Sequence, residues 1–186
     1  MSTPRPENDG VRSSSARTWL RRLGAIALGV QGGLIALTGL ALALLMVLQT
    51  VLRYGLEEPF LGIEETAVLL GLWFYFLGLS YATRSDAQIK GGVAALVIKN
   101  PQRLSALRLA GTLVSLAIGV VFTGYAAHYW LAVHDSGRES TYMGWPKTLW
   151  VASMVVGFVL MTTYLALQAL REWRSLRARK RPESDQ

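Results

Sequence analysis

The sequence contains no cysteine, which excludes disulfide bonds, thiolate metal sites and thiol chemistry. It contains only two histidines, His128 and His134, and their spacing places them on different faces of a helix. A haem site built from facing histidines within one subunit is therefore excluded. From these two absences we expect no cofactor and no metal.

Charge is absent from four long stretches of the chain. Asp, Glu, Lys and Arg do not occur in Leu23–Leu52, Thr66–Thr83, Leu109–Val133 and Thr148–Leu170. A helix of about 18 residues or more can cross the roughly 30 Å hydrocarbon core of a bilayer. We therefore predict an all-α membrane protein with four transmembrane helices.

The four stretches also lack the groups that catalysis or ion coupling requires. Without a carboxylate or an activated nucleophile at depth, no enzyme is expected. Carrier sites usually contain charges or broken helices near the membrane midplane, whereas the one strongly polar residue deep in the first span is Gln31. A stand-alone tetraspan carrier or a membrane assembly factor nevertheless stays open as the alternative to an auxiliary subunit.

Basic residues gather in the N-terminal tail, the second connection and the C-terminal tail, and only Arg53, Arg138 and Lys147 lie elsewhere. A four-span protein places those three segments on one side of the membrane, which the positive-inside rule assigns to the cytoplasm. We therefore predict that both termini are cytoplasmic. This topology and contact with anionic membrane lipids account for the net charge of +7, so no nucleic-acid partner is expected.

The distribution of polar residues predicts three parts and one additional helix. We expect a disordered cytoplasmic tail over residues 1–17. Thr18 would cap the first helix of a four-helix transmembrane domain over residues 18–176, and a basic cytoplasmic tail would follow over residues 177–186. Apolar side chains at helical spacing predict a short amphipathic interfacial helix between spans two and three, at Ile89, Val93, Leu96 and Val97.

Two prolines mark the expected starts of the last two helices. Asn100 can cap a helix that has Pro101 in its first turn, so the third helix is expected from Pro101 to about Val133. The fourth is expected to begin at Pro146 and to continue past the bilayer. Small residues four positions apart let a neighbouring helix approach closely, and two such stripes occur: Ala25, Gly29 and Gly33, and Gly111, Ser115, Gly119 and Thr123.

Charged residues surround the first connection. Arg53 ends the first apolar stretch, and Glu64 with Glu65 precedes the second, where each charge opposes the helix dipole favourably. The short connection allows an ion pair of Arg53 with Glu64 or Glu65. Helix capping and contact with a partner at the outer surface both stay open for these residues. Arg84 lies at the inner end of the second span and is expected to be a snorkelling anchor.

The order of these residues resembles the small membrane subunit of TRAP transporters, the DctQ-type family. The elements that carry the resemblance are Arg53-Tyr54, Gly62-Ile63-Glu64-Glu65, an aromatic span with Trp73 and Gly78, then Arg84 and Gln88-Ile89. Gln88 stands where the family usually has histidine, and Gly91-Gly92 replaces its acidic region.

This resemblance implies a non-catalytic subunit of a sodium-coupled secondary transporter for organic acid anions in a bacterial inner membrane. It implies two protein partners, a large permease subunit that carries the substrate and a periplasmic solute-binding protein that captures it. The small subunit would scaffold the permease. Residues expected to pack in the bundle or to face a partner are Arg53, Glu64, Glu65, Gly71, Trp73, Gly78 and Arg84.

Overall fold

The computed structural model describes residues 9–55, 61–97 and 101–180, which form four long helices. They are α1 (Asp9–Gly55), α2 (Gly62–Val97), α3 (Pro101–Asp135) and α4 (Thr148–Lys180). Each helix contains a segment that is long and apolar enough to cross a membrane. The predicted all-α architecture with four spans is therefore confirmed.

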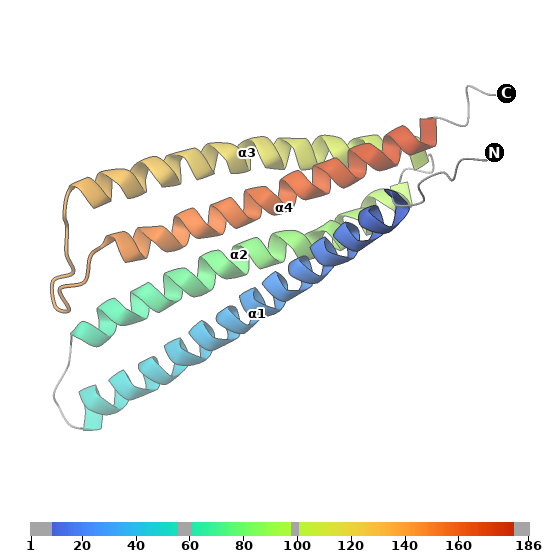
Figure 1. The fold of residues 1–186 in the computed structure, drawn as a ribbon. Coiled ribbons are helices and arrows are strands. Elements are labelled where there is room, and N and C mark those ends of the chain that lie inside the picture. Colours follow the sequence, from blue (N-terminus) through green and yellow to red (C-terminus); the bar gives the residue numbers. More distant parts are fainter. Residues whose placement is uncertain (1–8, 56–60, 98–100, 181–186) are drawn as a thin grey trace, which may run out of the picture.

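The helices lie side by side in the order α1, α2, α4, α3 (Figure 1). α2 packs against α1 and α4, and α4 packs against α2 and α3, whereas α2 and α3 barely touch. We call the end where α1 begins and α4 finishes the terminal end. The opposite end, with the α1–α2 and α3–α4 connections, is the loop end, and α2 and α3 spread apart toward it (Figure 1).

The starts of α3 and α4 agree closely with the positions of the two prolines. α3 begins at Pro101 as predicted and continues to Asp135. α4 begins at Thr148, directly after the turn that contains Pro146. Proline is favoured at the position of Pro101 because its fixed φ suits the first helical turn and its missing N–H has no partner there. Pro146 lies two residues before α4, opposite Glu139 in the connection. Asn100, the predicted cap of α3, lies outside the described residues.

The first two helices are longer than the sequence predicted. α1 begins at Asp9 rather than at Thr18, because residues 11–23 contain neither proline nor glycine to interrupt it. α2 continues without a break to Val97, so the amphipathic stretch is the last part of α2 and not a separate helix. Gly91-Gly92 does not end α2, because each helical glycine costs only about 1 kcal/mol. That this stretch lies on the membrane surface stays a prediction, as does the cytoplasmic location of the two tails.

Gln31 connects three of the four helices. Its Nε2 donates to the Leu77 carbonyl at 3.1 Å and to the Ser80 hydroxyl at 2.6 Å on α2. Its Oε1 accepts a hydrogen bond from the Tyr164 hydroxyl on α4 at 2.7 Å. Gln31 is 5% exposed and Ser80 is fully buried. Because an unpaired amide in an apolar environment is costly, these bonds fix how α1, α2 and α4 are aligned.

Glycines permit the closest approaches of α2 to its neighbours. A Cβ at Gly157 on α4 would lie 2.6 Å from Cβ and 2.8 Å from the carbonyl oxygen of Phe76 on α2. A Cβ at Gly39 on α1 would lie 2.9 Å from Cε2 of Phe74. The aromatic run of α2 therefore uses two glycines, one on each side, to pack within the layer.

The two predicted stripes of small residues have different surroundings. On α3, a Cβ at Gly119 would lie 3.0 Å from Oγ1 of Thr162, and the Thr123 and Thr162 hydroxyls are 2.9 Å apart. Part of this stripe is therefore the contact between α3 and α4. On α1, Cβ atoms at Gly29 and Gly33 would meet nothing within 4 Å, so these two positions face away from the other described helices.

Candidate partner interface at the loop end

The carboxylate of Glu65, in the first turn of α2, holds the connection between α3 and α4. Oε1 accepts a hydrogen bond from the Thr141 N–H at 2.9 Å. Oε2 accepts hydrogen bonds from the N–H groups of Tyr142 at 3.3 Å and Met143 at 3.2 Å, and from the Ser140 hydroxyl. Because four donors converge on one ionised group, the connection is fixed to α2.

The connection itself is a small hairpin. The Lys147 N–H donates to the Arg138 carbonyl at 2.9 Å, and the Ser140 N–H donates to the Trp145 carbonyl at 2.7 Å. Gly144 reverses the chain with a φ of 65°, a conformation that glycine adopts without strain. The base of the hairpin therefore brings Arg138 and Lys147 next to each other.

Glu64 faces α1 and is exposed. One of its oxygens accepts a hydrogen bond from Nε2 of Gln49 at 2.9 Å. The ion pair of Arg53 with Glu64 or Glu65, which the short connection allowed, does not form among the described residues: Gln49 donates to Glu64, and the hairpin donates to Glu65. The guanidinium of Arg53 instead lies 5.9 Å from the centre of the Tyr54 ring. Gln49 lies one helical turn before Arg53, and α1 reaches the level of Glu64 at that turn.

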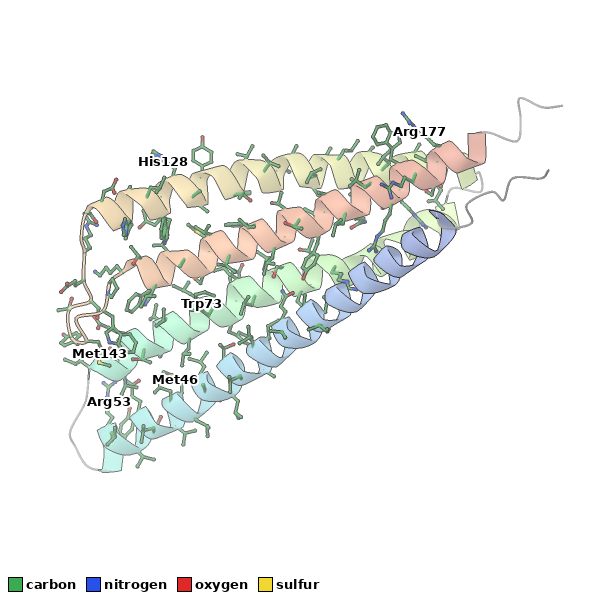
Figure 2. The ribbon with its side chains drawn as sticks, viewed as in Figure 1. Met46, Arg53, Trp73, His128, Met143 and Arg177 are labelled. Carbon is green, nitrogen blue, oxygen red and sulfur yellow. The ribbon has the colours of Figure 1, made fainter. Side chains whose placement is uncertain are left out.

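Two hollows open beside Glu64 and Val68 of α2. The first has a volume of about 420 Å³ and lies among α2, α3, α4 and the hairpin. The second has a volume of about 500 Å³ and lies between α1 and α2, with Arg53 in its wall. Figure 2 places Arg53 and Met143 at this loop end and Arg177 at the opposite end. The loop end is therefore an uneven surface that combines charged and apolar side chains.

The predicted partner-facing residues do not form one surface. Arg53, Glu64 and Glu65 lie at the loop end, as described above. Further along α2, Trp73 is half-buried, and a Cβ at Gly71 would lie 4.0 Å from Cδ2 of Leu42 on α1. Gly78 faces open space, and Arg84 is exposed at the end of the α2 span that lies away from the loop end. A partner role for each of these residues stays a prediction.

Sequence reasoning missed the four donors to Glu65. The available signals were an acidic residue in the first turn of a helix and the polar pair Ser140-Thr141 in the connection between the last two spans. Both are common in surface loops, and 75 positions separate Ser140 from Glu65. Because the contact depends on how α2 lies beside α4, a single sequence contains no local pattern that joins them.

Four apolar helices in one layer define a multi-pass membrane protein. The family model of the DctQ component of tripartite ATP-independent periplasmic transporters matches residues 42–175. The chain belongs to this family, and it is a small membrane component of a TRAP transporter. The predicted resemblance is thereby confirmed. No curated protein matches the chain significantly. The tripartite family implies a large permease and a periplasmic binding protein as the other two components.

Proposed function

We propose that this chain is a non-catalytic scaffold for the permease of a sodium-coupled transporter of organic acid anions. In this proposal it lies in a bacterial inner membrane, with the loop end in the periplasm and the terminal end in the cytoplasm. The charge distribution supports this orientation, because α4 finishes with Arg171, Arg174 and Arg177 while few basic residues lie at the loop end.

The observation that carries the proposal is how little of each span the chain covers by itself. None of the residues in the most apolar part of α1 is buried, and only 11% are buried in α3 and 17% in α2 and in α4. A single layer of helices does not surround a path for ions or solutes. Broad apolar faces suit contact with lipid or with a larger membrane protein, so we assign the substrate and sodium sites to the permease.

Three groups of residues would then contribute differently to the complex. At the loop end, Arg53 and Glu64 are exposed and can meet the permease or the docked binding protein, while Glu65 orders the hairpin. Along α2, Gly71, Trp73 and Gly78 would pack within the layer or against the permease. Arg84 would anchor the inner end of α2 at the membrane surface.

Co-purification and reconstitution test this assignment. A tagged chain should be isolated from its native membrane together with a larger multi-span protein. In proteoliposomes, uptake driven by a sodium gradient should require the chain, the permease and the binding protein together. Uptake by the chain alone would contradict the scaffold role and favour the stand-alone carrier. If the permease needs the chain only during its insertion into the membrane, and not during uptake, the chain would instead be an assembly factor.

A further inference from the structure

The first hollow at the loop end contains two cations without a carboxylate partner. Arg138 and Lys147 both line it, and the hydrogen bond between their backbones holds them next to each other. Within the part of the chain that the structure describes, neither side chain forms an ion pair. The two carboxylates of the same hollow, Glu64 and Glu65, already accept hydrogen bonds from other residues. Those donors are neutral and leave both carboxylates charged, so the two negative and two positive side chains of the hollow balance in number. Within the described residues, Arg138 and Lys147 are the charged side chains of the hollow that have no hydrogen-bonded partner and can meet a phosphate.

Apart from the Ser140 hydroxyl, which donates to Glu65, the rest of the wall is aliphatic or aromatic. It consists of side chains from three helices, Val68 on α2, Tyr129 and Val133 on α3, and Trp150 and Val151 on α4. Tyrosine and tryptophan are the side chains that favour the boundary between hydrocarbon and headgroups. The hollow lies where α2 and α3 diverge (Figure 1), and its volume of about 420 Å³ is in the range of small-molecule sites.

We propose that this hollow binds the phosphate headgroup of a membrane phospholipid. The phosphate would accept hydrogen bonds from the Arg138 guanidinium, which suits bidentate contact, and from the Lys147 ammonium. The glycerol and the first part of one acyl chain would lie against Val68, Val133 and Tyr129. The lipid would lie over the start of α4, in the hollow that α2 and α3 flank.

Charge and wall chemistry together favour a phospholipid over the other anions that could reach this place. A free phosphate would satisfy the two cations but would leave the apolar wall in contact with water. An acidic side chain of a partner protein would also leave the apolar wall in contact with water, unless apolar groups of the partner accompany it. A phospholipid has an anionic phosphate and an acyl chain at the required separation, and it is present at this depth in the membrane. The site does not depend on the proposed scaffold role.

Native mass spectrometry of the full chain in mild detergent tests the site, with phosphatidylethanolamine added as a net-neutral probe. R138A/K147A should retain this lipid at least about tenfold more weakly than the unchanged chain, because two charge-assisted contacts are lost. R171A/R174A is the matched control, since it removes two exposed arginines from α4 outside the hollow, and it should retain the lipid fully. R138K/K147R keeps both charges and should also retain it.

Each contrary result overturns the proposal. Equal retention by R138A/K147A and the unchanged chain would show that the two cations do not hold the lipid. Equal loss in R171A/R174A would show a general effect of charge. Binding of inorganic phosphate as tight as that of the lipid would show an anion site without a role for the acyl chain. Absence of lipid from the purified complex with the permease would show that protein occupies the hollow. Circular dichroism confirms that each variant is folded.

Discussion

Glu65 accepts a hydrogen bond from the N–H of Thr141 at 2.9 Å, across 76 positions of sequence. This contact and three more from Ser140, Tyr142 and Met143 join the start of α2 to the hairpin between α3 and α4. One carboxylate thereby fixes the position of the hairpin and of the cations at its base. The first prediction tests this role.

Glu65→Gln should loosen the hairpin. The substitution keeps the shape of the side chain but removes its charge and turns one acceptor into a donor that faces other donors. We expect a loss of about 1–3 kcal/mol in the local opening free energy, measured as faster hydrogen exchange at the amides of residues 141–143. Glu139→Gln changes an exposed carboxylate in the same hairpin and should leave this exchange unchanged. Equal exchange in both variants would contradict the role of Glu65.

Gln31→Leu should destabilise the layer. It removes the hydrogen bonds to Leu77 and Ser80 and leaves the Tyr164 hydroxyl without its acceptor. The expected loss is about 1–3 kcal/mol in the free energy of unfolding, measured by denaturation in detergent micelles. Thr163→Val is the control, because this exposed hydroxyl bonds only within its own helix. If Gln31→Leu and the control have the same free energy of unfolding, the Gln31 amide does not stabilise the packing of the three helices.

Gly157→Ala should separate α2 from α4. The added methyl group would overlap backbone and side-chain atoms of Phe76, and such overpacking costs about 1–3 kcal/mol. Gly111→Ala is the matched variant on α3, where a Cβ meets nothing within 4 Å. It should be neutral or stabilise the helix by up to about 1 kcal/mol. The thermal unfolding temperature should therefore fall for Gly157→Ala and stay the same or rise for Gly111→Ala. A shift of the same sign and size in both variants would contradict the close approach.

Glu64→Lys should weaken the complex without unfolding the chain. Glu64 is exposed and bonds only to Gln49 within the described residues, so reversal of its charge acts mainly on what meets the loop end from outside. We expect reduced co-purification with the permease or reduced uptake, together with unchanged unfolding of the isolated chain. Gln49→Leu removes the internal hydrogen bond but leaves the charge, and should retain the complex. Uptake by Glu64→Lys at the level of the unchanged protein would exclude Glu64 from the interface.

Local signals in the sequence were sufficient for the spans and for two helix starts. Length and absence of charge predicted four membrane helices, and Pro101 and Pro146 predicted where the last two begin. The family resemblance followed from the order of short motifs, and the match over residues 42–175 agrees with it. These features depend on neighbouring residues only, and they do not require knowledge of how the helices pack.

The arrangement of the helices and the contacts at the loop end required the structure. Membrane depth alone allowed an ion pair of Arg53 with Glu64 or Glu65, but the rotation of α1 about its axis places Gln49 at Glu64 instead. The contact between Glu65 and the hairpin depends on the neighbouring position of α2 and α4. Both contacts thus depend on how each helix is rotated about its axis and on which helices are neighbours. Four uniformly apolar spans contain little information about either.

The single layer also has a consequence for how the chain can change during evolution. Many of its large apolar side chains are exposed, so exchange of one of these for another of similar character leaves the packing between its own helices intact. Residue identity is constrained mainly at a few contacts between helices, such as Gln31 with Ser80 and Gly157 with Phe76. Related subunits can therefore diverge far in overall identity while they keep the number of spans and these contacts.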